Sequence, residues 1–253
     1  QQELTPLVAN LAIAAKRWNL GMTIDAEEAD RLDLSLDIFE SLASDPRLTN
    51  WQGLGLAVQA YQKRAIYVID YIIDLARRTN RRIMLRLVKG AYWDSEIKWA
   101  QERGFSSYPV FTRKAATDVS YIACVKRVLA ATDVLYPQFA THNAHTVALI
   151  TELVKDYTDF EFQCLHGMGD SLYINTKFAC RIYAPVGDHK SLLAYLVRRL
   201  LENGANNSFV NRIVDGDQEA QLIHETFIEN NKATVCSLNI DCCSKESELL
   251  IQA

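Results

Sequence analysis

Short apolar runs that alternate with longer amphipathic stretches constrain the fold of this chain more than any other feature of its sequence. The runs have the length of strands, and the stretches between them place apolar residues three and four positions apart, as on one face of a helix. Strands that alternate with helices indicate right-handed βαβ units and a parallel sheet. The predicted strands cover residues 21–25, 54–58, 83–88, 134–140, 160–165, 180–183 and 208–213.

The spacing of these strands favours a closed barrel over an open, doubly wound sheet. No G-x-G-x-x-G fingerprint of a dinucleotide-binding sheet occurs in the sequence. A length of 253 residues also suits one α/β barrel. We therefore predict an α/β fold of the (βα)8 TIM-barrel type over residues 1–213, followed by a helical or irregular tail of unknown role over residues 214–253.

Composition argues against several other classes of protein. The net charge is −4 and no long block of basic residues occurs, so binding of nucleic acid is not expected. No apolar run reaches the ~18 residues of a membrane span. The six cysteines show no C-x-x-C spacing, which suits a reducing compartment. We expect a soluble, cytoplasmic protein, and peripheral contact with the inner face of a membrane remains an open alternative.

The stretch from Arg86 to Asp94 passes from a predicted strand into a charged, aromatic turn. Arg86 alone interrupts the apolar run 83–88, which is predicted to be covered on both faces, so this arginine needs a partner. The turn supplies a cation, two aromatic rings and a glycine that allows close approach to a ligand: Lys89, Tyr92, Trp93 and Gly90. A ligand site and a purely structural ion pair both remain open.

Ligand-contacting residues of a parallel barrel lie at the carboxyl ends of its strands. Six side chains fall at or near predicted strand ends: Asp25, Gln59, Arg86, His142, Leu165 and Tyr183. This recurrence favours an enzyme. Asp25 has an alternative role, because together with Glu28 it matches a capping box that would open a helix over residues 26–43.

A polar stripe is predicted on the helix 189–203. Tyr195, Arg198, Arg199 and Glu202 follow helical spacing, and apolar residues occupy the opposite face: Leu193, Leu196, Val197 and Leu200. Two adjacent arginines could bind one carboxylate through paired hydrogen bonds. A solvated outer face, with Glu202 partly neutralising the arginines, is the competing interpretation.

Other chemistries lack their motifs. His142 and His145 have no carboxylate or cysteine at a zinc-ligand spacing, so no metal site is expected. Cys164 lies in an apolar strand, where a cysteine usually acts as a small hydrophobic residue. A serine hydrolase would need a G-x-S-x-G elbow.

The chain resembles the proline dehydrogenase domain of the bifunctional flavoenzymes called proline utilization A. The resemblance runs from about Gly21 to Ile213. It rests on TIDAEEADRL (23–32), QAYQKR (59–64), RLVKGAYWDSEIK (86–98), YPQFATHNAHT (136–146), EFQCLHGMG (161–169), CRIYAPVG (180–187) and LLAYLVRRLLENGAN (192–206).

This resemblance implies a multifunctional flavoprotein of proline catabolism. The expected cofactor is FAD, and the expected substrate is L-proline. A hydride would pass from proline C5 to flavin N5, which yields Δ1-pyrroline-5-carboxylate. The electrons would then pass to a membrane quinone.

The resemblance also implies roles for individual residues. Arg198 and Arg199 would bind the proline carboxylate, and Glu202 would hold the two arginines. The other residues that line the substrate pocket would be Asp25, Tyr92, Leu165, Tyr183 and Tyr195, and the catalytic residues would include Asp25, Arg86 and Tyr183. Arg86 would lie beside flavin N5. The remaining flavin contacts would be Gln59, Val88, Gly90, Ala91, Trp93, Thr112, Lys114, Thr141, His142, Asn143, Gln163 and Cys164.

Two departures from the family pattern stand out. The family's first barrel strand, which carries an active-site lysine, has no counterpart before Leu4, and the connection 167–179 is short. A barrel that lacks a strand exposes two sheet edges. We expect a fragment, an engineered minimal version of the domain or a sequence with residues missing. A working proline dehydrogenase and a truncated barrel that binds flavin or a partner without turnover are therefore both open.

Overall fold

The structure, a computed structural model, describes residues 2–174 and 176–206. The chain divides into two compact units, Gln1–Pro185 and Val186–Ala253. The first unit contains a six-stranded sheet with the order β1-β2-β3-β4-β5-β6, in which all neighbours are parallel. Its strands are β1 (Met22–Ile24), β2 (Leu54–Gln59), β3 (Ile83–Val88), β4 (Leu135–Ala140), β5 (Glu161–Leu165) and β6 (Ala179–Tyr183).

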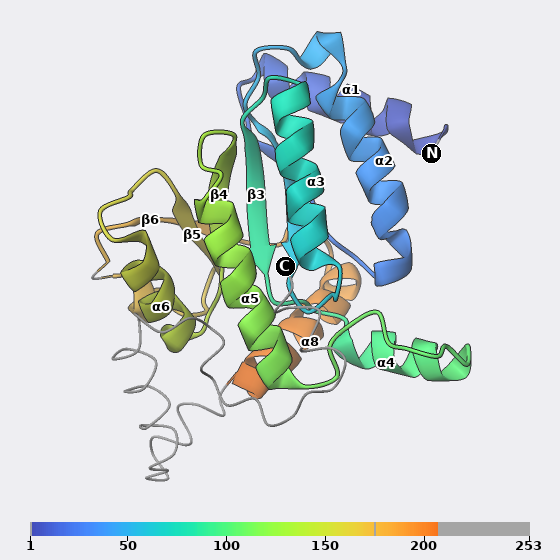
Figure 1. The fold of residues 1–253 in the computed structure, drawn as a ribbon, viewed down its shortest axis with the longest axis vertical. Coiled ribbons are helices and arrows are strands. Elements are labelled where there is room, and N and C mark those ends of the chain that lie inside the picture. The colour runs from blue at the N-terminus through green and yellow to red at the C-terminus, as the bar shows by residue number, and fades with distance from the viewer. Residues whose placement is uncertain (1, 175, 207–253) are drawn as a thin grey trace. The chain divides into compact units, whose positions relative to one another are not determined.

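The α/β class and the first six predicted strands are confirmed, with every strand end within one residue of its predicted position. The strands form a curled, parallel half-barrel (Figure 1). The seventh predicted strand, 208–213, lies outside the described residues, as does the predicted tail 214–253. Closure into a full barrel and the domain boundary at residue 213 therefore stay predictions.

Helices connect the strands. The first unit contains α1 (Leu4–Arg17), η1 (Ala29–Arg31), α2 (Leu32–Ala43), η2 (Pro46–Leu48), α3 (Ala65–Arg78), α4 (Trp93–Glu102), α5 (Lys114–Leu129), α6 (Ala144–Val154) and α7 (Asp170–Tyr173). The second unit contains α8 (His189–Asn206), which ends three residues beyond the predicted helix. No helix in the described parts of the chain is long and apolar enough to cross a membrane.

Strand β3 shows how the sheet separates two environments. Ile83, Leu85 and Leu87 are fully buried on the side that faces α3 and α5, which lie side by side along the sheet (Figure 1). Met84, Arg86 and Val88 point to the other side and are only half-buried. The expectation that this strand is covered on both faces is therefore wrong for the described chain. At β3 the inner face of the half-barrel is the more open one.

Tertiary contacts override two local predictions. The chain after β1 does not enter a helix at residue 26, because η1 begins at Ala29 and α2 begins at Leu32. The capping box is therefore wrong, and Asp25 is used elsewhere. On α3, Val68, Ile72 and Leu75 are buried as the apolar spacing predicts. The same apolar spacing predicts Tyr67 on this stripe, but Tyr67 is 52% exposed.

An aromatic cluster fastens β4, β5 and β6 together. The ring of Phe160 packs 5.3 Å from Phe162 and 5.0 Å from Phe178 between ring centres. Phe139 adds a third strand to the cluster. Tyr173 of α7, a helix that the sequence pattern did not predict, is buried here and donates its hydroxyl to the carbonyl oxygen of Thr141 at 2.7 Å. The cluster thus also anchors the loop after β4.

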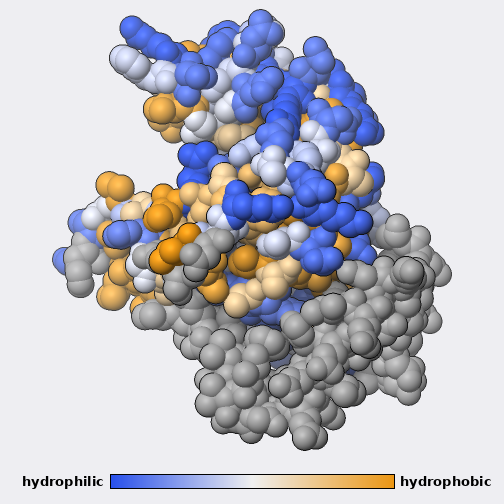
Figure 2. Space-filling model, turned by 90° about the vertical axis from the view of Figure 1, so that its left-hand side faces the viewer, coloured by the Kyte–Doolittle hydropathy of each residue, from blue (hydrophilic) through white to orange (hydrophobic). Residues whose placement is uncertain are grey.

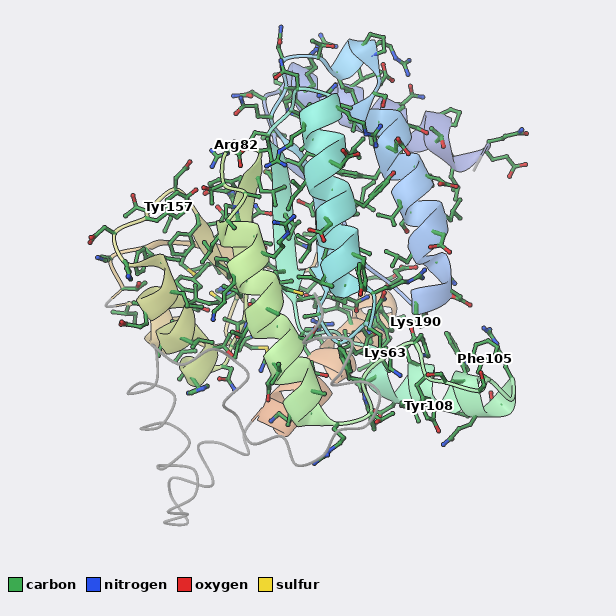
Figure 3. All side chains as sticks on the ribbon, in the orientation of Figure 1. Lys63, Arg82, Phe105, Tyr108, Tyr157 and Lys190 are labelled. Carbon is green, nitrogen blue, oxygen red and sulfur yellow. The ribbon has the colours of Figure 1, made fainter. Side chains whose placement is uncertain are left out.

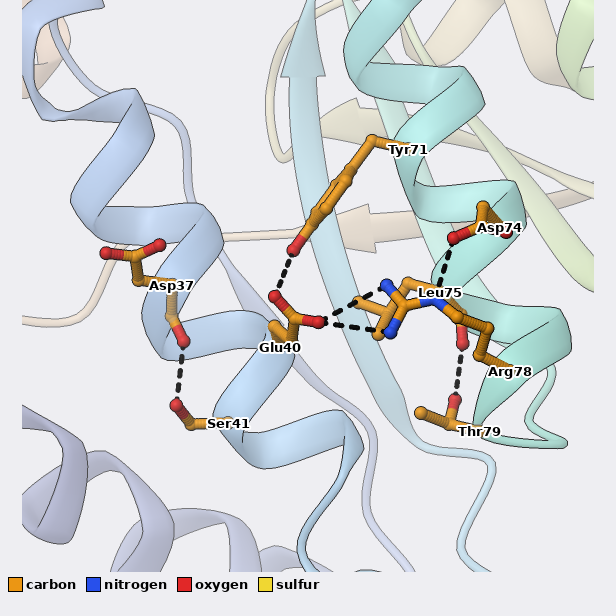
Figure 4. A network of polar contacts seen from close by, with 8 residues as sticks. All are labelled: Asp37, Glu40, Ser41, Tyr71, Asp74, Leu75, Arg78 and Thr79. Atoms are coloured by element: carbon orange, nitrogen blue, oxygen red, sulfur yellow. Dashed lines mark hydrogen bonds and ion pairs between the residues drawn. The ribbon is translucent and has the colours of Figure 1, made fainter.

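A polar network joins α2 to α3 on the outside of the half-barrel (Figure 4). The carboxylate of Glu40 accepts a hydrogen bond from the hydroxyl of Tyr71 at 2.7 Å and lies 3.2 Å from two nitrogens of Arg78. The Tyr71 and Arg78 hydrogen bonds lower the pKa of Glu40. Burial and the bond to Glu40 raise the pKa of Tyr71 to about 12. These contacts add polar links between the two helices to the apolar packing that they share in the core.

Strand β6 is the least covered part of the sheet. Ile182 is 58% exposed, and Ile174 in the connection before the strand is 75% exposed. Figure 2 turns the side that carries α6 and β6 toward the viewer, and apolar residues gather over the middle of that face. Both β6 and β1 pair with a single neighbour among the described strands. The half-barrel therefore has two open edges within the described residues.

Candidate active site

The carboxyl ends of the parallel strands form one rim of the half-barrel. Gln59 ends β2, Leu165 ends β5 and Tyr183 ends β6, while Asp25 follows β1 directly. Leu165 and Tyr183 are register partners. Arg82 and Tyr157 mark the opposite end of the sheet (Figure 3). The sequence prediction that these residues share one rim is confirmed in its geometry.

Arg86 is held on the inner face by two partners. Its Nη1 lies 2.5 Å from Oδ1 of Asp25, and its Nε donates to Oε1 of Gln163 at 2.8 Å. The Arg86 side chain is 26% exposed and that of Asp25 is 73% exposed. The expected partner of the arginine is therefore the carboxylate that directly follows β1, together with an amide from β5. The contact leaves one side of the guanidinium accessible from the inner face.

Sequence reasoning missed Glu161, the centre of the polar contacts on the inner face. Its carboxylate accepts hydrogen bonds from Arg181 at 2.8 Å, from Gln163 at 2.7 Å and from Gln138 at 2.9 Å. Glu161 is 3% exposed. A carboxylate at the first position of an apolar strand is easily taken for the boundary of the strand. The signal that could have found Glu161 is its spacing of two residues from Gln163, which places both polar side chains on one face of the strand.

The loops after β2 and β3 are tied together at the rim. Gln59 donates to the carbonyl oxygen of Glu27 at 2.7 Å and accepts from the N–H of Ala91 at 3.4 Å. Gly90 has φ +136°, and a Cβ there would lie 2.4 Å from the ring of Tyr61. Packing of Tyr61 therefore already requires this glycine, whether or not a ligand approaches it.

Lys89 and Trp93 are also engaged with neighbouring elements. The Lys89 ammonium lies 2.5 Å from a carboxylate oxygen of Asp118 on α5. The indole N–H of Trp93 donates to the carbonyl oxygen of Phe111 at 2.8 Å. Five further predicted contacts lie on this side of the rim: Val88, Ala91, Tyr92 and Thr112 are half-buried, while Lys114 is exposed at the start of α5.

The loop after β4 is organised around the start of α6. Asn143 caps the helix by accepting from the N–H of Thr146 at 3.0 Å, and Thr141 accepts from the N–H of Asn143 at 3.1 Å. His142 accepts from the N–H of Leu165 at 2.9 Å through Nε2, which assigns the ring proton to Nδ1. Among the described residues no group of three or more potential metal ligands occurs.

Cys164 belongs to the packed core. It is 1% exposed, and its sulfur lies 3.7 Å from that of Cys180. Side chains alternate along a strand, so Cys164 points to the helix side of β5, opposite Gln163 and Leu165. This placement agrees with its interpretation as a small hydrophobic residue.

In the second unit, α8 carries the predicted arginine stripe. Arg198 and Arg199 are half-buried, and the guanidinium carbon of Arg199 lies 5.3 Å from the ring centre of Tyr195. Tyr195 and Arg199 therefore share one helix face, as their spacing predicts. The apolar residues Leu193, Leu196 and Val197 are 54%, 43% and 44% exposed. The side chain of Glu202 lies outside the description, so the carboxylate clamp stays a prediction.

A cavity of about 280 Å³ lies beside the loops that follow β1, β2 and β3. None of the predicted site residues lines it. Its wall includes Lys63, Phe105 and Tyr108, which lie together at this end of the unit (Figure 3), and the buried Glu96. Glu96 accepts from the N–H of Ala29 at 2.6 Å, and burial raises its pKa. Glu96 and the buried Ala100 are four residues apart on α4 and therefore share one helix face. This spacing was the sequence signal for the burial of Glu96.

The structure is an α/β half-barrel that holds an arginine on its inner face, close to the carboxyl ends of the strands. Comparison of the sequence with known families identifies the class of protein to which such a half-barrel belongs. Residues 4–212 match the family described as proline dehydrogenase. The chain belongs to the proline dehydrogenase family.

The similar proteins are bifunctional enzymes and single dehydrogenases. Bifunctional protein PutA of Klebsiella aerogenes is 59% identical over 226 residues, which cover 85% of this chain and 17% of the relative. Proline dehydrogenase 2, mitochondrial, of Arabidopsis thaliana is 31% identical over 214 residues, covering 77% and 43%. A crystal structure of a variant of Bradyrhizobium japonicum proline utilization A matches with a TM-score of 0.78 and 59% identity, over 82% of this chain and 22% of that one. The chain thus spans less than a fifth of the first curated relative's length.

Proposed function

We propose that this chain is the proline dehydrogenase part of a longer, bifunctional flavoenzyme. It would oxidise L-proline to Δ1-pyrroline-5-carboxylate. The observation that carries this proposal is the fixed position of Arg86, which Asp25 and Gln163 hold on the inner face of a half-barrel whose sequence is 59% identical to that of PutA. The same residues would lie at the centre of a full (βα)8 barrel completed by segments beyond those described.

The residues on the inner face suit FAD. Oε1 of Gln138 is buried without a hydrogen-bond partner among the described residues. A buried acceptor of this kind calls for a donor from a ligand or water. The Arg86 guanidinium supplies a fixed positive charge on the same face, which would stabilise the negative charge that the isoalloxazine gains when it accepts a hydride. Bound FAD would accept the hydride that leaves C5 of proline while the proline nitrogen loses a proton.

The chain's own residues would position the two reactants. Arg198 and Arg199 would bind the proline carboxylate, held by Glu202, and Tyr195 would stack against Arg199. Leu165, Tyr92 and Tyr183 would line the pocket and exclude water from the hydride path. Asp25 would keep Arg86 in place beside the flavin. No protein nucleophile is required.

The other flavin contacts follow the loops already described. Gln59, Val88, Gly90, Ala91 and Trp93 would contact the flavin from the loops after β2 and β3, and Thr112 and Lys114 from the start of α5. Thr141, His142 and Asn143 surround the amino end of α6, where N–H groups favour phosphate. Gln163 would act from its side chain, whereas Cys164 points into the core and would act through its backbone.

An absorbance spectrum and a proline-to-dye assay test this proposal together. The purified chain should be yellow, hold FAD noncovalently and reduce a dye when proline is added. A colourless protein that takes up no FAD during incubation contradicts the cofactor assignment. We also propose a membrane quinone as the natural acceptor, with a cytoplasmic location and peripheral contact with the membrane.

The open edges at β1 and β6 favour a second candidate. A half-barrel whose edge strands pair with no further strand among the described residues could bind flavin or a partner without catalysing turnover. This alternative would be supported if the chain takes up flavin but excess proline does not bleach the flavin absorbance.

A further inference from the structure

A row of polar side chains crosses the inner face of the half-barrel and ends on Arg86. Gln163 accepts from Nε of Arg86 at 2.8 Å and donates its own amide N–H to Oε1 of Glu161 at 2.7 Å. We propose that Glu161 is a positioning residue that fixes the Arg86 guanidinium through Gln163. This proposal rests on the proposed function, in which Arg86 lies beside the flavin.

The order of donors and acceptors explains how Glu161 orients a residue that it does not touch. A carboxylate only accepts hydrogen bonds, so Glu161 requires the NH2 end of the Gln163 amide to face it. The carbonyl oxygen of Gln163 is then turned toward Arg86. With the amide reversed, Gln163 would present an N–H to the N–H of Arg86, and the bond would be lost.

The surroundings keep Glu161 in this acceptor-only state. Burial acts to raise the pKa of the Glu161 carboxyl, but the hydrogen bonds from Arg181, Gln163 and Gln138 outweigh burial and hold the pKa below its ordinary value. Arg181 contributes two bonds of 2.8 Å, one to each carboxylate oxygen. Among the described residues, the hydroxyl of Tyr136 also faces the carboxylate, 3.5 Å from Oε2.

Strand register places the row with little freedom. Arg86 is paired with Gln138 across β3 and β4, and Gln138 is paired with Glu161 across β4 and β5. Gln163 is paired with Arg181 across β5 and β6. The backbone pairing therefore aligns these side chains. It does not determine which way the Gln163 amide points, and the hydrogen bond to Glu161 does.

A merely structural Glu161 would stabilise the edge of the sheet without acting on Arg86, and the experiment separates these roles. Glu161→Gln keeps the shape of the side chain but can donate as well as accept. Glu96→Gln is the matched control, because Glu96 is 4% exposed and bonds the Ala29 N–H rather than the row. Each variant is prepared alone, and Glu161→Gln is also combined with Gln163→Met.

Two readouts are measured. The first is the Nε–H signal of Arg86 in the 15N-labelled chain, assigned with an Arg86→Lys variant, and its rate of exchange with solvent. The second is the pair of kinetic constants with proline, together with the FAD dissociation constant and the reduction potential. The NMR signal requires no activity, so it tests the row even if the proposed function fails.

We expect Glu161→Gln to speed exchange of the Arg86 signal and to lower kcat about tenfold, with KM changed less than about twofold. Glu96→Gln should do neither, and Glu161→Gln should add no further loss in the Gln163→Met background. If Glu161→Gln does not fold, Glu161→Asp, which keeps the charge but withdraws it from Gln163, should reproduce the faster exchange. An unchanged Arg86 signal in the folded variant, or an equal kinetic loss with and without Gln163, overturns the proposal.

Discussion

Asp25, which follows the edge strand β1, bonds Nη1 of Arg86 two strands away on β3 at 2.5 Å. The arginine reaches across β2 over Ala57, its register partner, whose side chain is small enough to leave the path open. The pair therefore links the rim at one open edge of the half-barrel to its centre. The contribution of this pair to stability and its proposed contribution to catalysis can be measured separately.

Replacing Asp25 with Asn should lower activity more than stability. The carboxylate is 73% exposed, so solvent screens the pair and its loss should cost about 0.5 kcal/mol or less of unfolding free energy. Loss of the charge beside Arg86 should reduce kcat/KM for proline by at least about tenfold. Urea unfolding and steady-state kinetics on the same preparation decide between the two. A large stability loss with unchanged kinetics would assign Asp25 a structural role only.

Arg199→Met tests the carboxylate clamp. Removal of one charge-assisted partner of a ligand carboxylate should weaken binding of a ring-and-carboxylate inhibitor by roughly one to two powers of ten, while FAD stays bound. Lys190→Met is the control, because Lys190 is an exposed cation on the same helix. Equal inhibitor dissociation constants for the wild type and both variants would return the arginines to a solvated face.

Gly90→Ala should destabilise the fold strongly. The added Cβ would lie 2.4 Å from the Tyr61 ring at a φ of +136°, and the expected loss is about 2 kcal/mol or more of unfolding free energy. Gly104→Ala is the matched control, since Gly104 has φ +64° with nothing within 4 Å of its Cβ position. It should cost about 1 kcal/mol. Similar losses in chemical unfolding would mean that Tyr61 moves aside.

Two buried glutamates should show opposite pH dependence. The folded pKa of Glu161 is lowered, so its contribution to stability is present above the ordinary carboxyl pKa and is lost as the pH falls through the folded pKa. Burial raises the folded pKa of Glu96, so its contribution is present below the ordinary value and is lost as the pH rises through the folded pKa. The free energy of unfolding that wild type has in excess of Glu161→Gln should therefore become smaller as the pH falls. For Glu96→Gln, the stability of the wild type relative to the variant should instead become smaller as the pH rises. Urea midpoints from pH 3.5 to 7 measure both.

Local patterns predicted the scaffold well because apolar periodicity is set by each element's own burial. All six described strands and the stripe of Val68, Ile72 and Leu75 follow from it. The same patterns misread Asp25, since the capping signature depends on Glu28 nearby whereas the observed partner, Arg86, is 61 residues away. Glu161 was missed for the same reason. Its partners come from β4 and β6, and strand register, which sequence periodicity does not fix, brings them together.

The candidate site residues fall into two groups, those whose contacts the structure describes and those placed only by helical spacing. Asp25, Arg86 and Gln163 meet through contacts that the structure describes, so their juxtaposition is established even though their roles remain proposals. Arg198 and Arg199 could be assigned to one helix face from spacing alone. Which surface that face meets depends on packing between units, and helical periodicity carries no information about it.

The order of the strands in the sheet follows their order in the chain, from β1 to β6. Each of the described strands from β2 to β6 can therefore pair with one that has already left the ribosome, without waiting for a distant segment to be synthesised. Short separations between paired strands also lower the entropy cost of forming each contact. Assembly can advance at the pace of translation, one strand and helix at a time.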